Sequence, residues 1–285
     1  MSRLIDISQP LGPDTAVWPG DRPVRLEWTL RRAAGDAVDV AAVSFSVHAG
    51  THVDGPMHTG DGPGAGDLAL EPFIGPAVVV DGRPHAAGDP PLVGPTVLDG
   101  VDPAATPRLL IRTRDEADFR AFPDPFAALA PALADRIVER GFVLVGTDAP
   151  SVDAVDSKTL ASHRILAEAG IPNVENLVLS GVVPGRYTFI GLPLRLAEAD
   201  SAPAPGPSPV CIGPSTWVPA CTLRDTAAAS TASPAARRRV HASRTGRSPG
   251  QTAVSGPSGW EMSISRLTGA RSPCRARAPG RTRRS

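Results

Sequence analysis

The chain has 285 residues, enough for one large domain or two small ones, and its 29 basic residues balance its 29 acidic ones. The balance hides two parts of opposite charge, since 27 of the acidic residues precede residue 201 and 13 arginines follow residue 200. No apolar run is long enough for a transmembrane helix or for the core of a signal peptide, which argues against a membrane protein and predicts a cytoplasmic one.

Strand-like runs dominate the first 200 residues. RLIDIS (3–8) and AVSFSVH (42–48) alternate apolar and polar residues, as half-buried strands do. Three later runs, at 76–80, 109–111 and 142–145, are apolar throughout and predict buried strands. The pattern indicates an α/β domain that contains more strand than helix.

Two helices are predicted between and after these strands. PALADRIVERG (131–141) begins with proline, places Leu133 and Ile137 on one side, and stops at Gly141. HRILAEAG (163–170) follows Ser162, an N-cap candidate, and ends at a glycine.

Composition changes sharply after residue 200, where Arg, Pro, Ser and Ala follow one another without period. Such a segment buries too little apolar surface to offset its ordering entropy, so we expect residues 201–285 to be a disordered tail. All three cysteines fall in it, which leaves the domain of residues 1–200 without thiolate ligands or disulfides.

The origin of the tail is open to two interpretations. We hypothesise a frame-shifted or read-through product of a GC-rich gene, which an intact reading frame in the DNA coding residues 198–212 would contradict. The alternative is a genuine basic tail that binds nucleic acid, although its arginine runs lack the interleaved aromatic residues of a stacking surface.

HAGTHVDGPMH (48–58) holds three of the six histidines, His48, His52 and His58, together with Asp54. A lone histidine among glycines is more often solvated than a ligand. The even intervals, however, would direct all four side chains to one side of an extended chain, and Gly50 permits a bend. Two imidazoles and a carboxylate suit Zn²⁺, or less selectively Mn²⁺ and Fe²⁺.

Further ligands are expected at His163 and Glu175. A helix that starts at His163 rises about 10 Å, and the five steps from Gly170 to Glu175 span up to about 16 Å. Glu175 can therefore return beside His163. The alternative is a salt bridge between Glu175 and Arg164.

With these residues in view, the chain resembles the metal-dependent cyclase-like amidohydrolases, most closely their bacterial kynurenine formamidase branch. The matching stretches are DISQPLGPDTAVWPGD (6–21), HAGTHVDGPMH (48–58), GTDAPSVD (146–153) and SHRILAEAGIPNVENL (162–177). The resemblance covers residues 3–200 and implies a single swivelling β/β/α domain and a homodimer. Thr59 and Gly60 depart from the family, where an aromatic and an acidic residue often follow the motif.

The resemblance also implies an arylformamidase that hydrolyses N-formyl-L-kynurenine to L-kynurenine and formate in tryptophan degradation. A hydroxide generated by two Zn²⁺ ions would attack the formyl amide. The implied roles are first-ion binding by His48 and His52, second-ion binding by His163, bridging by Asp54 and Glu175, acid/base catalysis by His58, and ring stacking by Trp18.

Three alternatives to these assignments remain. Trp18 is equally well explained as a partly buried residue beside Pro19. The same metal site suits an isatin hydrolase-like cyclic amide hydrolase that uses Mn²⁺. A non-enzymatic metal-binding protein with a basic interaction tail is the third, although all six inferred ligand and acid/base residues are present.

Overall fold

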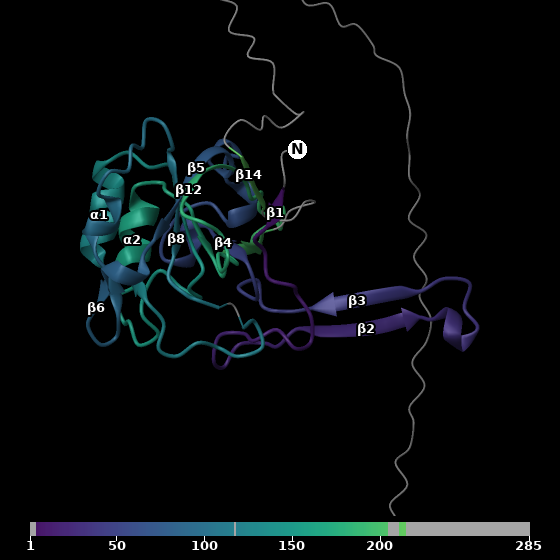
Figure 1. Cartoon of the computed structure of the whole chain (residues 1–285). Helices are drawn as coiled ribbons and strands as arrows, with labels where there is room; N and C mark the ends of the chain where they lie inside the picture. Colours follow the sequence, from purple (N-terminus) through teal and green to yellow (C-terminus); the bar gives the residue numbers. More distant parts are fainter. Residues whose placement is uncertain (1–3, 117, 205–210, 215–285) are drawn as a thin grey trace, which may run out of the picture. The chain divides into compact units, whose positions relative to one another are not determined.

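The structure is a computed structural model that describes residues 4–116, 118–204 and 211–214. Within these residues a nine-stranded mixed sheet has the order β1-β14-β12-β5-β8-β10-β11-β4-β13 (Figure 1). Its strands are β1 (Ile5–Asp6), β4 (His52–Asp54), β5 (Ile74–Asp81), β8 (Arg108–Arg112), β10 (Leu144–Thr147), β11 (Asn173–Glu175), β12 (Gly185–Ile190), β13 (Ser201–Pro203) and β14 (Cys211–Pro214). The α/β, strand-rich fold predicted from the sequence is confirmed.

The middle of the sheet is parallel and buried on both faces. Strands β5, β8, β10 and β11 run in the same direction, whereas β4 and β12 flank them antiparallel. Neighbouring residues of β8 alternate between two cores, Leu109 and Ile111 facing one and Leu110 the other. This explains why the runs at 76–80, 109–111 and 142–145 are apolar throughout.

Both α-helices contribute to the core that contains Leu109. Helix α1 (Pro131–Glu139) buries Leu133 and Ile137, and helix α2 (Ala161–Glu168) buries Leu166. The predicted helices are thus present, but Ser162 does not cap the second. The N-cap is Leu160. Ser162 is the second residue of the helix, and its hydroxyl donates to the Leu129 carbonyl at 2.9 Å.

The remaining elements are short. A three-stranded sheet contains β6 (Ala86–Ala87), β7 (Leu92–Val93) and β9 (Ala128–Leu129). The 3-10 helices span Arg32–Ala34, Pro56–His58, Ala65–Asp67, Glu71–Phe73, Arg83–His85 and Pro95–Leu98.

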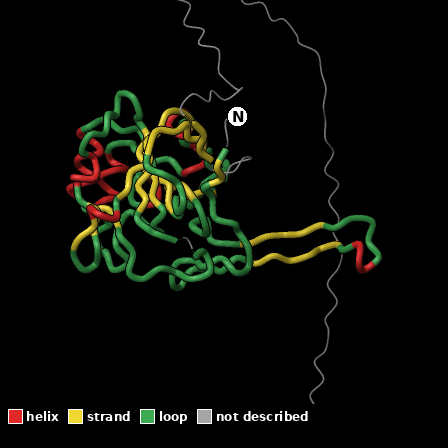
Figure 2. The backbone as a smooth tube through the Cα atoms, viewed as in Figure 1, coloured by secondary structure: helices red, strands yellow, loops and turns green. Residues whose placement is uncertain are grey.

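A hairpin of β2 (Arg25–Leu30) and β3 (Val40–Ser44) projects from the rest of the described domain (Figures 1 and 2). Every residue of both strands is exposed. The half-buried strand predicted at 42–48 is therefore wrong in extent and in burial. The alternating pattern arises because the two faces of the hairpin differ in polarity. The strand ends at Ser44, and residues 47–50 form a turn.

The sheet continues past residue 200, so the predicted boundary lies too early. Strand β13 pairs antiparallel with β4, and β14, which contains Cys211, pairs with β1 and β12. The composition of this segment did not predict β13, because the strand is held by backbone pairing with β4 rather than by large apolar side chains. The rest of the predicted tail, 205–210 and 215–285, lies outside the described residues.

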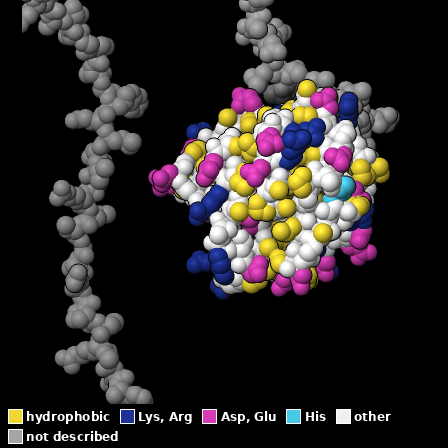
Figure 3. Space-filling view, turned by 90° about the vertical axis from the view of Figure 1, so that its left-hand side faces the viewer, with side chains coloured by type: hydrophobic (Ala, Val, Ile, Leu, Met, Phe, Trp, Pro, Cys, Tyr) yellow, Lys and Arg dark blue, Asp and Glu magenta, His cyan; other side chains and the backbone are white. Residues whose placement is uncertain are grey.

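Within the part of the chain that the structure describes, no helix is long and apolar enough to cross a membrane. On the face shown in Figure 3, acidic and basic side chains are interspersed among hydrophobic ones. The cytoplasmic location stays a prediction.

Candidate metal centre

The pairing of β4 with β11 builds the floor of the candidate centre. His52 lies opposite Glu175, and Asp54 lies opposite Asn173. Because directly opposed residues and residues two apart share a face of a sheet, all four side chains converge. All four are buried.

His48 reaches the cluster from a turn rather than from a strand. Gly50 has a φ of +64°, and this left-handed conformation reverses the chain between His48 and His52. The two imidazole rings lie 5.0 Å apart, centroid to centroid. The prediction that even spacing puts the side chains on one side of an extended chain therefore holds only for His52 and Asp54. The bend expected at Gly50 is present.

His163 enters from the first turn of α2 and is oriented by Asp153. One Asp153 oxygen accepts from the backbone N–H of Ser162 at 3.0 Å, and the other lies 2.7 Å from His163 Nδ1. The same carboxylate thus accepts a free backbone N–H of the first helical turn and fixes the orientation of the His163 ring, a candidate ligand. Asp153 was missed although it belongs to the GTDAPSVD stretch, because its partner is ten residues away.

The structure brings the five predicted ligands together. His163 Nε2 lies 3.1 Å from Glu175 Oε1, and His48 Nδ1 lies 3.1 Å from Asp54 Oδ1. Glu175 pairs with His52 and His163, not with Arg164 as in the alternative.

Three buried atoms, His52 Nε2, Asp54 Oδ1 and His163 Nε2, face side chains of the cluster at 3.1–3.5 Å, but none forms a hydrogen bond of good geometry with the described residues. Unsatisfied buried polar atoms are rare, and those found in native structures indicate a missing ion, water or function. Imidazole nitrogens and carboxylate oxygens are the donors that first-row divalent metals take. The residues present therefore fit a divalent metal.

Electrostatics points the same way. Burial lowers the pKa of His48, but the hydrogen bonds and charges of Asp54 and Asp200 outweigh burial and raise it to about 9. Burial opposes ionisation of Asp54, yet the neighbouring histidines hold its pKa well below the usual value. The site thus favours positive charge, which a metal would supply by displacing protons.

Amide N–H groups hold the carboxylates of Asp54 and Glu175 in place. Asn173 Nδ2 donates to Asp54 Oδ2 at 2.9 Å and to Glu175 Oε1 at 3.0 Å, and the Val152 N–H also donates to Glu175. Asn173 was not singled out from the sequence, although its position two residues before Glu175 on a strand is the signal for a shared face.

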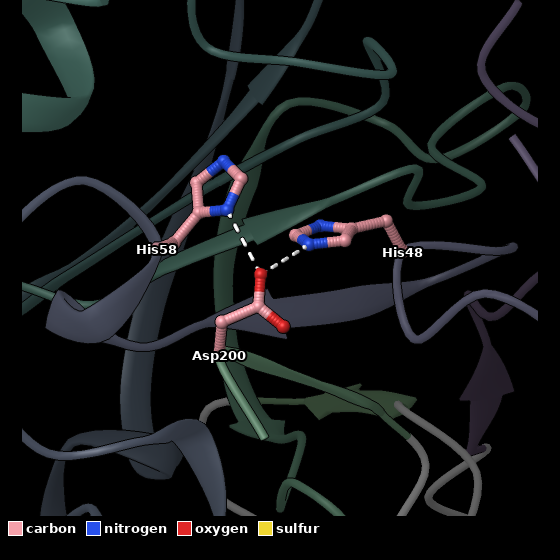
Figure 4. A group of neighbouring side chains, drawn as sticks. All are labelled: His48, His58 and Asp200. Atoms are coloured by element: carbon pink, nitrogen blue, oxygen red, sulfur yellow. Dashed lines mark hydrogen bonds and ion pairs between the residues drawn. The ribbon is translucent and has the colours of Figure 1, made fainter. Parts of the chain in front are cut away.

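His58 lies beside the cluster on a 3-10 turn that begins with Pro56. Its ring is 4.6 Å from that of His48 and 5.4 Å from that of His163, centroid to centroid. Its Nδ1 faces Asp200 at 3.2 Å (Figure 4). Asp200 was not expected in the site, because it falls at the predicted end of the domain.

A cavity of about 440 Å³ opens onto these histidines. Its walls include Trp18, Phe119, Phe122 and Arg114. The indole of Trp18 meets the Phe122 ring edge to face, with centroids 5.2 Å apart. The structure thus places Trp18 on the cavity wall, while its packing on Phe122 also accounts for its partial burial.

Together the nine-stranded mixed sheet, the buried histidine–carboxylate cluster and the adjoining cavity define an α/β protein with a site suited to a divalent metal. The family model named Cyclase matches residues 5–154. The kynurenine formamidases of Salinibacter ruber and Bordetella petrii are 42% and 40% identical to this chain. They cover 70% and 71% of it, and the alignments span 94% and 96% of those relatives.

Two solved structures share the fold. A protein titled a "potential metal-dependent hydrolase with cyclase activity" aligns with a TM-score of 0.61 at 22% identity, over 75% of this chain and 99% of its own. Isatin hydrolase A from Labrenzia aggregata aligns with a TM-score of 0.61 at 21% identity, over 75% of this chain and 94% of its own. The chain belongs to the cyclase family. The expectation of a hydrolase of the kynurenine formamidase type is confirmed by its curated relatives.

Proposed function

We propose that the chain hydrolyses N-formyl-L-kynurenine to L-kynurenine and formate, with two Zn²⁺ ions per subunit and Mn²⁺ as the alternative metal. The proposal rests on the curated relatives and on the cavity beside the cluster. That cavity combines an aromatic wall with the cation of Arg114. A substrate with a flat ring and an α-carboxylate matches both features.

The oxygen atoms of the two central carboxylates support two ions. Asp54 Oδ1 faces His48 and His52, whereas Asp54 Oδ2 faces His163 at 3.4 Å. Glu175 divides likewise, with Oε2 lying 3.3 Å from His52 Nε2 and Oε1 nearest His163. In this assignment His48 and His52 would hold the first ion, His163 would hold the second, and Asp54 and Glu175 would offer one oxygen to each.

A divalent pair held there supplies Lewis acidity, which lowers the pKa of water and polarises a carbonyl oxygen. The chain must supply the remaining steps. Expulsion of kynurenine requires a proton on the anilide nitrogen, and we assign its delivery to His58, which borders the cavity. We assign Trp18 to packing on the substrate ring, a contact of about 0.5–1.5 kcal/mol beyond area burial.

The substrate assignment is tested with full-length protein loaded with Zn²⁺ or Mn²⁺ and assayed on N-formyl-L-kynurenine and isatin in parallel. We expect kynurenine release, and an Arg114→Gln variant with KM for formylkynurenine raised about 10-fold through loss of a charge-assisted hydrogen bond. Hydrolysis of formanilide, which lacks the amino acid end, is expected to be unchanged.

Arg136→Gln is the matched control, because Arg136 lies on the exposed side of α1 and pairs only with Glu139 among the described residues. Turnover of isatin but not of formylkynurenine would refute the substrate assignment. An Arg114→Gln variant with an unchanged KM would show that Arg114 does not bind the substrate.

We further propose that the chain is a homodimer that uses the β2–β3 hairpin. Leu26, its cross-strand partner Val43 and Trp28 share one face of the hairpin on the near side of the register shift that follows Trp28, and all three side chains are exposed. A lone hairpin is marginally stable in water, and an exposed apolar face of this kind usually marks an interface. A second copy of the chain would cover it.

Trp28→Glu is therefore expected to give a monomer in light scattering coupled to gel filtration, where the unaltered protein gives a dimer. Glu27→Lys, on the polar face of the same strand, is the control and is expected to stay dimeric. A monomeric unaltered protein, or a dimeric Trp28→Glu variant, would contradict the proposed interface.

A further inference from the structure

Asp200 joins two histidines to which the proposed function gives different tasks. Its Oδ2 lies 2.9 Å from His48 Nε2 and 3.2 Å from His58 Nδ1 (Figure 4). A carboxylate is an acceptor only, so each ring nitrogen that faces it carries the hydrogen. Figure 4 shows both rings turned toward this single oxygen.

The consequence for the two rings follows from the single N–H of a neutral imidazole. Nδ1 of His48 also faces a carboxylate oxygen, Asp54 Oδ1 at 3.1 Å, but a metal held in the cluster would need the lone pair of that nitrogen, and the single N–H would then lie on Nε2, toward Asp200. If Nδ1 of His58 carries the N–H of that ring, the lone pair is on Nε2, on the side of the ring away from Asp200. One carboxylate thereby sets the tautomer of a metal ligand and of the acid/base residue.

The backbone holds Asp200 in this place from both sides. Its carbonyl accepts the Gly55 N–H at 2.8 Å, and the preceding Ala199 carbonyl accepts the Ala65 N–H at 3.1 Å. After it, Ser201 lies opposite Asp54, and the Ser201 hydroxyl donates to the Val53 carbonyl at 2.8 Å. Asp200 is therefore tied to the strand that bears His52 and Asp54.

A close approach of two backbones also fixes the segment before Asp200. A Cβ on Gly64 would lie 2.3 Å from the Ala199 carbonyl oxygen, so this contact requires glycine. Asp200 is not among the residues that line the cavity, and its side chain is 41% exposed. Its placement serves the histidines rather than the substrate.

We propose that Asp200 is a positioning residue that holds His48 in its metal-binding tautomer and His58 in its proton-transferring tautomer. The proposal rests on the proposed function for the roles of the two histidines. Partners of this kind fix ring orientation in metal sites and in nucleophile–histidine–carboxylate triads. When His58 gains a proton, Asp200 also stabilises the imidazolium.

The test combines a tautomer measurement with kinetics on the zinc-loaded full-length chain. Long-range nitrogen–hydrogen NMR of histidine-labelled protein distinguishes Nδ1–H from Nε2–H, and the chain has only six histidines. A His58→Gln variant identifies the signal of His58. In the unaltered protein we expect hydrogen on His58 Nδ1 and on His48 Nε2.

In Asp200→Asn the shared acceptor loses its charge: an amide oxygen in its place would accept from both rings more weakly, and an amide N–H there would require a lone pair from the rings instead. We expect kcat to fall about 10- to 100-fold, with KM unchanged and two zinc ions still bound by elemental analysis. Glu198→Gln, the same chemical change two residues earlier at an exposed position, is expected to alter none of these quantities.

Hydrogen on His58 Nε2 in the unaltered protein would overturn the proposal whether or not the variant folds. Loss of a zinc ion in Asp200→Asn would make Asp200 a ligand, and unchanged kinetics and spectra would give it no role. If the unaltered protein fails to release kynurenine, the proposed function falls, while the tautomer spectra still decide the role of Asp200.

Discussion

Replacing His58 with alanine is expected to lower kcat on N-formyl-L-kynurenine by about 10²- to 10⁴-fold, the usual contribution of a general acid or base. Metal content is expected to stay the same, because the described contacts of His58 are with Asp200 and the neighbouring rings rather than with Asp54 or Glu175. Steady-state kinetics and elemental analysis of the zinc-loaded protein measure both quantities.

His85→Ala is the matched control for this variant. His85 lies on a separate 3-10 turn, where its Nδ1 faces the Thr96 hydroxyl at 2.8 Å, and it does not line the cavity. Full activity of His58→Ala would refute its catalytic role. Loss of one metal ion per chain would instead show that His58 is a ligand.

A chain that ends at Asp200 is expected to unfold at a clearly lower temperature than a chain that ends at Arg224. The shorter one loses β13, which pairs with β4, and β14, which pairs with β1 and β12, together with the buried residues Ala202 and Ala204. It leaves the Val53 and Thr51 carbonyls without the partners they have in Ser201 and Ala204. Lost hydrogen bonds and unsatisfied groups of this kind cost about 3 kcal/mol or more together.

In a domain of this size the difference corresponds to a Tm lower by about 6–12 °C. Thermal unfolding followed by circular dichroism measures it, and the chain that ends at Arg224 serves as the control because it keeps all the described strands. Equal Tm values for the two truncations would mean that β13 and β14 add nothing to the stability of the fold and that residue 200 is a valid boundary.

The sequence predicts the elements whose own residues carry the signal. The apolar runs of β5 and β8 and the period of α1 are local properties, and each is present in the structure. The strand expected at 42–48 was misjudged because alternation cannot distinguish a sheet face packed on a core from a hairpin that projects into solvent. Only tertiary contacts separate the two.

The same division holds for the site. His52, Asp54 and Glu175 were recognisable by residue type and spacing, and the structure brings them together. Asp153 and Asp200 were not, because an aspartate in a turn is common and the rings that they contact are supplied by distant segments. Ligand types follow from local chemistry, whereas the partners that orient ligands follow from the path of the chain.

The place of β4 between β11 and β13 has a consequence for how the protein matures. Asp54 meets Asn173 across 119 residues of chain, and Val53 meets Ser201 across 148. Pairings of such long range form late, after the loops between them have closed. During synthesis, the histidine motif must therefore wait until nearly the whole domain has left the ribosome before its site exists. If the site holds a metal as proposed, the complete ligand set is available to it only after these long-range contacts have closed.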